Sequence, residues 1–224
     1  MKKAKLELRV LRIVIPMMLI MGAMVFIPAG TLDFWEGWAF LFALFVPMFF
    51  VFIYMIRHER RLLEKRLNVR EKREKQKFIQ LFNTFLFVAS MTIAGLDHRY
   101  GWSYVPIWLV IASDVMMLLG YMLFIRTMLH NEYASRVIEV QRGQKVVDTG
   151  PYAVVRHPMY AAGILMYMFI PVALGSFWAI IPLLLLPAML IFRLLDEEKA
   201  LITGLKGYKR YMEKVKYRLI PGIW

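Results

Sequence analysis

The sequence predicts an all-helical, polytopic integral membrane bundle of about six spans. Hydrophobic residues fill 60% of the 224 positions, more than the share of about 45–50% found in soluble domains. Apolar stretches of roughly 20 residues are long enough to cross a bilayer as helices. Six such stretches lie at residues 10–28, 35–56, 78–96, 104–125, 158–175 and 177–195.

The first stretch follows a lysine-rich start, as in a secretory leader. The run is long, however, and the segment FIPAGTLDF after it offers no clear small-x-small cleavage site. We therefore expect a retained first span.

Basic residues indicate how the chain lies in the membrane. If the N-terminus is cytoplasmic and there are six spans, Arg99 is the only one of the 29 Lys and Arg residues on the outer side. Indole rings favour the headgroup level, and five tryptophans then lie at or near the outer boundary. They are Trp35, Trp38, Trp102, Trp108 and Trp178. We expect both termini in the cytoplasm, in a prokaryotic plasma membrane.

The charge pattern also divides the chain. Residues 1–56 form an N-terminal transmembrane hairpin, and residues 57–77, RHERRLLEKRLNVREKREKQK, are expected to form a basic cytoplasmic helix. Anionic lipid headgroups are its expected partner. A nucleic-acid partner is not expected, because aromatic residues are not interleaved with the basic ones. Residues 78–224 form the functional core.

Several classes of site have no support in the sequence. The chain has no cysteine, which excludes disulfides and thiolate chemistry. Its four histidines never lie four residues apart, so we expect no metal site. The glycine-rich signatures of dinucleotide sites, P-loops and hydrolase elbows are also missing.

A first polar cluster begins at Gly150, in the segment GPYAVVRHPMY. Pro158 suits the first turn of a helix, where backbone amides have no intrahelical partner and carry partial positive charge. Together with Arg156 and His157, these amides predict an anion-receptive corner at the membrane face. The alternative is that Arg156 reaches the headgroups and His157 caps the helix.

A second polar cluster lies at the end of the returning apolar helix, in FRLLDEEKALI. Arg193 and Glu197 are four residues apart and share one helix face. An ordinary ion pair explains Arg193 and one glutamate, but it does not explain Glu198 as a second acid in a cation-rich segment. The hairpin brings this cluster back toward His157, so the two clusters predict one site that holds a cationic group.

The two blocks carry a family resemblance. GPYxxxRHPxY, then RxxxEE, then GYKRY and IPG is similar to the isoprenylcysteine carboxyl methyltransferases and the related phospholipid methyltransferases, over roughly residues 126–224. The resemblance implies S-adenosylmethionine bound in a cytoplasmic pocket that the C-terminal segment roofs. It also implies a lipid-like or prenylated acceptor that enters from the bilayer.

The resemblance also implies residue roles. The cofactor-binding residues would be Gln144, Lys145, Val146, Val147, Tyr152, His157, Pro158, Met159, Tyr160 and Glu197. Two of these depart from the family, which often has histidine at Gln144 and, in carboxyl methyltransferases, serine at Met159. The catalytic residues would be Arg193, which meets the acceptor, and Glu198, which takes a proton from an amine acceptor.

These observations leave several functions open. The first expectation is methyl esterification of a carboxylate, as in prenylcysteine, and the alternative within the family is N-methylation of a phospholipid amine. Two other classes remain, an NADPH-dependent membrane reductase and a non-catalytic membrane protein. The sequence assigns neither the oligomeric state nor the role of Asp114, in the middle of the fourth span.

Overall fold

The computed structural model describes residues 3–67, 73–135 and 137–224. Within these ranges the chain forms helices and no strands, so the all-helical fold class is confirmed. Four helices are long and apolar enough to cross a membrane. They are α1 (Lys3–Ala29), α2 (Trp35–His58), α4 (Glu74–Tyr100) and α5 (Ile107–His130).

The last two predicted spans are shorter or broken. Helix α6 (Pro158–Ala173) has 16 residues, about 24 Å at 1.5 Å per residue, which is less than a bilayer core of about 30 Å. The next segment divides into α7 (Ile180–Leu183) and α8 (Leu186–Gly204). Pro187 lies in the first turn of α8, where its missing N–H costs no helical hydrogen bond. The number of crossings beyond four remains a prediction.

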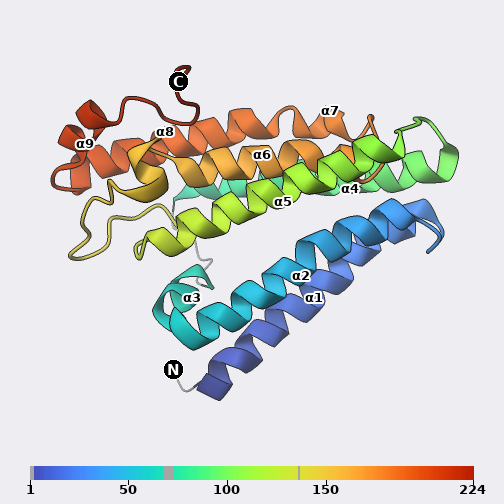
Figure 1. The fold of residues 1–224 in the computed structure, drawn as a ribbon, viewed down its shortest axis with the longest axis horizontal. Coiled ribbons are helices and arrows are strands. Elements are labelled where there is room, and N and C mark those ends of the chain that lie inside the picture. The colour runs from blue at the N-terminus through green and yellow to red at the C-terminus, as the bar shows by residue number, and fades with distance from the viewer. Residues whose placement is uncertain (1–2, 68–72, 136) are drawn as a thin grey trace.

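The helices form two groups in Figure 1. The α1–α2 hairpin lies along one side of the helices that follow it, with α1 packed against α4, and α5 packed against α6. The α5–α6 contact is close because Gly120 has no side chain. A Cβ at this position would lie 2.9 Å from the backbone nitrogen of Met166 and 3.1 Å from the Ala162 carbonyl oxygen.

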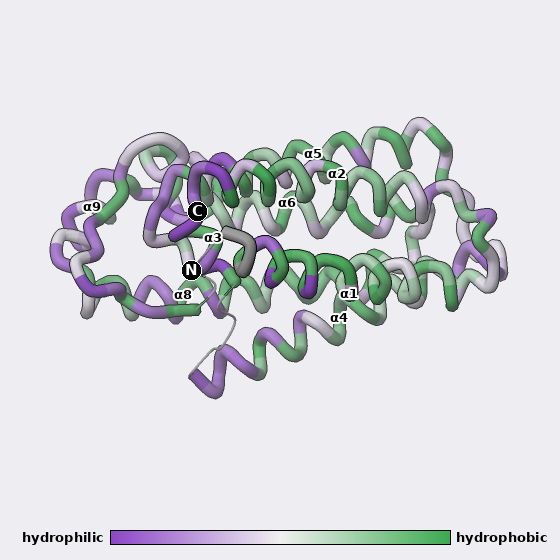
Figure 2. Tube along the Cα trace, turned by 90° about the horizontal axis from the view of Figure 1, so that it is seen from below, coloured by the Kyte–Doolittle hydropathy of each residue, from purple (hydrophilic) through white to green (hydrophobic). Residues whose placement is uncertain are grey.

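Most polar segments gather at one end of the bundle. Helix α3 (Arg60–Arg66), the 3-10 turn η1 (Gly150–Ala153), helix α9 (Tyr208–Lys214) and both chain ends lie there in Figure 1. Figure 2 shows apolar residues along the middle of the long helices and polar residues at this end. Having both chain ends together fits an even number of crossings, while the side of the membrane they face remains a prediction.

The predicted basic helix is not continuous. Helix α2 ends at His58, α3 ends at Arg66, and residues 74–77 already belong to α4. Glu59 breaks the first helix with a non-helical backbone (φ −126°, ψ 46°), while residues 68–72 lie outside the described residues. Lys65 and Arg66 bond to the carbonyl oxygens of Glu132 and Ser135 at 2.8 and 3.3 Å. Lys65 and Arg66 therefore bind the loop that follows α5.

The opposite end contains a buried carboxylate that the sequence did not reveal. Asp97 is 1% exposed. It accepts hydrogen bonds from the Ser103 backbone N–H at 2.7 Å and from the hydroxyls of Ser103 and Ser176. Because Ser103 follows α4 and Ser176 follows α6, Asp97 joins two turns of the bundle.

The five tryptophans expected at the outer boundary lie in the turns at this opposite end or in the helix starts beside them, each 45–69% exposed. They are Trp35, Trp38, Trp102, Trp108 and Trp178.

Candidate active site

A cavity of about 500 Å³ lies at the polar end of the bundle, within the range of about 300–1,000 Å³ typical of ligand sites. Its wall comes from the loop between α5 and η1, from the ends of α6 and α8, and from α9 and α4. Gly163 and Tyr167 continue the wall along α6, about one and two turns beyond Tyr160, opposite Leu190 of α8. The cavity therefore extends from the polar loops toward the apolar part of the bundle.

The part of the cavity wall that α9 forms packs in an apolar cluster. Tyr208, Tyr211 and Val215 are buried against Val140 and Val146 of the facing loop. Gly207 begins α9 with φ of +89°, a conformation that other residues rarely adopt. The sequence pattern GYKRY therefore turns the chain and places two tyrosines on the cavity.

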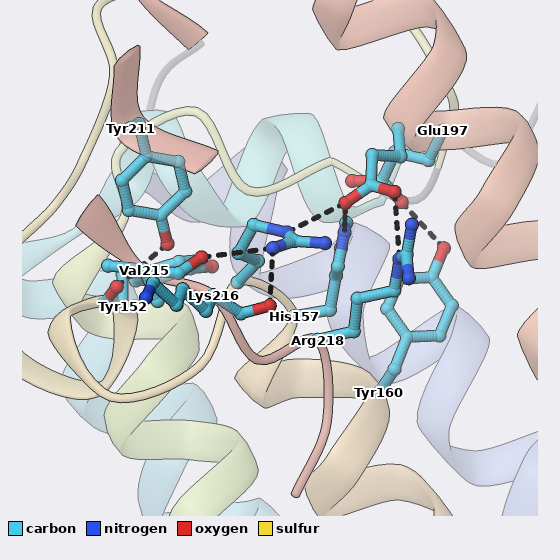
Figure 3. Close-up of polar contacts among 10 residues, drawn as sticks. Tyr152, His157, Tyr160, Glu197, Tyr211, Val215, Lys216 and Arg218 are labelled. Carbon is cyan, nitrogen blue, oxygen red and sulfur yellow. Dashed lines mark hydrogen bonds and ion pairs between the residues drawn. The ribbon is translucent and has the colours of Figure 1, made fainter. Parts of the chain in front are cut away.

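Glu198 is the centre of a buried ion-pair cluster beside the cavity (Figure 3). It is 3% exposed, and its two oxygens accept from Arg156 Nε at 2.8 Å and Arg218 Nε at 2.9 Å. Arg156 also donates to the carbonyl oxygens of Val215 and Lys216, at 2.9 and 2.7 Å. The cluster thus ties α8 to the start of α6 and to the C-terminal segment.

Backbone hydrogen bonds strengthen this connection. The N–H of Arg156 donates to the carbonyl of Tyr217, and that of His157 to the carbonyl of Arg218, both at 2.9 Å. These two amides lie at the corner that the sequence predicts to receive a ligand anion. Arg156 lines the cavity, but Nε and Nη1 of its guanidinium bond to Glu198 and the C-terminal carbonyls, so a ligand contact by Arg156 stays a prediction.

The environment of Glu198 disfavours its expected role as a base. Burial opposes its ionisation, but the neighbouring His157, Arg218 and Arg156 outweigh burial and lower the pKa of this carboxyl from 4.5 to about 2. Glu198 is also not part of the cavity wall. The catalytic role expected for Glu198 therefore stays a prediction that this environment disfavours; in the structure, Glu198 ties α8 to α6 and to the C-terminal segment.

In the described ranges, three cavity residues carry a buried polar atom without a well-formed hydrogen bond: Asn83 Oδ1, His157 Nε2 and the Tyr208 hydroxyl. His157 Nε2 lies 3.5 Å from Glu198 Oε1, too far for a well-formed bond, and the Tyr208 hydroxyl has no partner. Both side chains are about 95% buried, at 5% and 4% exposure. Buried polar groups are costly when left unpaired, so these two atoms suit a polar ligand.

The second predicted cluster also meets the cavity. Tyr160 donates its hydroxyl hydrogen to Glu197 Oε2 at 2.6 Å (Figure 3), and the Arg193 guanidinium interacts with the same hydroxyl. Arg193 Nη1 also donates to Gln76 Oε1 at 2.8 Å. The pair Arg193 and Glu197, four residues apart on α8, therefore presents one cation and one anion to the cavity.

Tyr152 stands on the loop side of the cavity. Its hydroxyl accepts a hydrogen bond from Asn131 Nδ2 at 3.0 Å, and its carbonyl accepts one from the Tyr211 hydroxyl at 2.7 Å. Burial raises the pKa of the Tyr152 hydroxyl to about 12, so this group is neutral at physiological pH. Tyr152 connects the loop after α5 to the C-terminal helix.

The structure brings most of the predicted site residues together. The cavity wall contains Arg193, Gln144, Lys145, Val146, Val147, Tyr152, His157, Met159, Tyr160 and Glu197. Pro158 is buried at the start of α6 and does not line the cavity, nor does Asp114. Sequence reasoning missed Gln76, Arg218, Tyr208 and Tyr211. The segment GYKRY contains the two tyrosines, whereas no pattern marked Gln76.

Comparison with known proteins agrees with this site. A family model described as phospholipid methyltransferase matches residues 108–206. No individual curated protein matches the chain. The matched region contains α5, the loop, η1, α6 and α8, which supply most of the cavity wall. Residues 108–206 therefore resemble the phospholipid methyltransferase family, within the isoprenylcysteine and phospholipid group that the motifs resemble, and this similarity indicates a membrane methyltransferase.

Proposed function

We propose that the chain binds S-adenosylmethionine in the cavity and catalyses transfer of its methyl group to a lipid-like acceptor. The main support is that one cavity in the family-matched region is lined by Arg193 and by every residue expected for the donor except Pro158. Its extension along Gly163, Tyr167 and Leu190 toward the apolar bundle suits an acceptor that lies in the bilayer.

The residues present fit the donor's functional groups. S-adenosylmethionine carries a carboxylate, an amino group, hydroxyls and a sulfonium. The Tyr208 hydroxyl is buried without a hydrogen-bond partner, and His157 Nε2 has only the 3.5 Å contact with Glu198, so the two suit the carboxylate and the hydroxyls. Glu197 suits the amino group or the ribose, and the rings of Tyr152 and Tyr160 suit a cation.

In methyl transfer, the main task of the protein is to position the donor and the acceptor. The bound donor supplies an electrophilic methyl group, so no nucleophilic side chain is needed. The chain has to hold the reacting atoms in line within about 3–3.5 Å and exclude water. Tyr208 and Tyr211 of α9 line the cavity, and the C-terminal segment that follows them, which Arg156 and Glu198 hold, would serve the second purpose.

We propose a carboxylate as the methyl acceptor, as in prenylcysteine, with Arg193 bonding to both of its oxygens. A phospholipid amine is the second candidate, favoured by the description of the matched family. An amine has to lose a proton, and Glu197 is the available base, because it lines the cavity and Glu198 does not.

Methyl-labelled S-adenosylmethionine and a panel of membrane lipids and prenylcysteines test the proposal. We expect labelled lipid from the purified protein. Release of the label by base as a volatile product identifies a methyl ester, and base-stable label identifies an amine. The double variant His157→Ala/Glu197→Ala should lose transfer. Binding of NADPH in place of the donor would favour the reductase, and full function in the double variant would favour a non-catalytic protein.

A further inference from the structure

Gln76 is a buried amide that connects the candidate active site to α4. It is 1% exposed, although it lies only two residues after the start of α4. Its Oε1 accepts from Arg193 Nη1 at 2.8 Å, and its Nε2 donates to Asp196 Oδ2 at 2.7 Å. Arg73 Nη1 binds the same Asp196 oxygen at 3.1 Å. Gln76 thus lies between a cation and an anion of α8.

Only a side chain with both an acceptor and a donor satisfies this position. Arginine only donates and an ionised aspartate only accepts, which also fixes the orientation of the Gln76 amide. Leucine would leave two bonding groups unpaired, and glutamate would face the Asp196 carboxylate. Asparagine has the right chemistry but is one methylene too short to reach both partners.

The bond to Gln76 matters because Arg193 lines the cavity. A free arginine side chain carries about 2 kcal/mol of rotamer entropy, part of which an anchor removes before a ligand arrives. The anchor is on α4, outside residues 108–206 that match the family. The family region therefore receives part of its site geometry from a helix that precedes it.

We propose that Gln76 is a positioning residue that holds the Arg193 guanidinium toward the acceptor. This inference rests on the proposed function, in which Arg193 binds the acceptor. It predicts that loss of the Gln76 amide weakens acceptor use while donor binding is unaffected, because the donor residues His157, Tyr208 and Glu197 do not bond to Gln76.

Four variants of the full-length protein in detergent test this role. Gln76→Leu and Gln76→Asn should each raise the acceptor KM about tenfold, with the donor KM within twofold of the wild type. The swap Gln76→Glu/Asp196→Asn keeps the bond donated by Arg193, reverses the donor and acceptor of the bond between positions 76 and 196, and leaves the net charge unchanged, so its acceptor KM should return to within threefold. Lys75→Leu, at an exposed neighbouring position, is the control.

A second readout needs no catalysis. Phenylglyoxal reacts with accessible guanidinium groups, and peptide mass spectrometry gives the rate at Arg193 relative to the exposed Arg142. We expect faster labelling of Arg193 in Gln76→Leu and Gln76→Asn, and the wild-type rate in the swap. This rate tests positioning even if the wild type transfers no methyl group, a result that would overturn only the proposed function.

Two results would overturn the inference. One is an unchanged Arg193 labelling rate in both single variants. The other is a swap variant that remains as impaired as Gln76→Leu although its melting temperature equals that of the wild type. The swap keeps the test decisive if Gln76→Leu fails to fold.

Discussion

Two adjacent glutamates on α8 have different roles. Glu197 reaches the cavity and accepts the Tyr160 hydroxyl hydrogen, whereas Glu198 points into the ion-pair cluster with Arg156 and Arg218. Neighbouring residues on a helix are rotated by about 100°, so Glu197 faces the cavity and Glu198 faces the ion-pair cluster.

Replacement of Glu198 should destabilise the protein. Glu198→Gln keeps the volume of the side chain but leaves the buried Arg156 guanidinium without a counter-charge, and we expect the free energy of unfolding to fall by about 3–5 kcal/mol. An SDS unfolding titration measures this change. The control is Glu213→Gln, an exposed position on α9. Equal effects of the two substitutions would show that the cluster is not important for stability.

The same carboxyl should make stability depend on pH. The pKa of Glu198 is lowered from 4.5 to about 2, so the folded state binds fewer protons than the unfolded state between these values. The stabilisation is complete above pH 4.5 and is lost as the pH falls toward 2. Melting temperatures from pH 6 to pH 2 should show this loss in the wild type. A decline of the same size in Glu198→Gln would contradict the assignment.

For α8, the sequence predicted which polar residues lie near the cavity better than it predicted the contacts that each of them makes. The pattern RxxxEE identified Arg193, Glu197 and Glu198, because acids in a basic segment need a partner. The pattern did not predict that Arg156 would be that partner for Glu198. That contact joins residues 42 positions apart in the chain and depends on how the hairpin closes.

Helix α5 and helix α6 support the cavity through a glycine contact. The Cβ of any other residue at Gly120 would lie 2.9 Å from the backbone nitrogen of Met166, and backbone cannot yield as a flexible side chain can. Gly120→Ala should therefore separate the two helices and cost about 1–3 kcal/mol of stability. The control is Gly22→Ala in α1, where nothing lies within 4 Å of the new Cβ. Equal stability of the two variants would show that the close approach is unimportant.

The helices themselves were predictable where apolar runs are long. All four membrane-length helices lie on predicted spans, because hydropathy over about 20 residues is a strong signal. The prediction was weaker near charges and prolines. It placed one basic helix at 57–77, where the structure breaks the chain at Glu59, and it did not foresee that α8 begins with Pro187 in its first turn.

The end of the molecule opposite the candidate site has a buried polar contact of its own. Asp97 joins the α4–α5 turn to the α6–α7 turn, which lie at the end of the bundle opposite α9 in Figure 1. Asp97→Asn should weaken charge-assisted hydrogen bonds and cost about 1.5–3 kcal/mol, without changing the Kd for S-adenosylhomocysteine. Thermal unfolding and calorimetric titration measure the two effects, and the exposed Asp33→Asn is the control. A changed Kd at normal stability would contradict this expectation.

The overall assembly was the least predictable part of the molecule. Motif spacing indicated that two polar clusters meet across a hairpin, and the shared cavity agrees with this. The C-terminal segment over Arg156 and the Gln76 contact depend on backbone carbonyls and on a single amide, which leave no periodic pattern in a sequence. Within the described ranges, the cavity wall takes no residue from α1 or α2, although they account for two of the four membrane-length helices.

The loops of the cavity wall lie at one end of the bundle. A soluble donor would therefore reach the proposed site from only one side of the membrane. In sealed proteoliposomes, molecules whose cavity loops point inward would be hidden from a donor that does not permeate lipid. We expect latency: activity should rise when such vesicles are permeabilised. The size of the rise reports how many molecules were inserted inward, so the same measurement on vesicles of known orientation from the native membrane reveals the native sidedness.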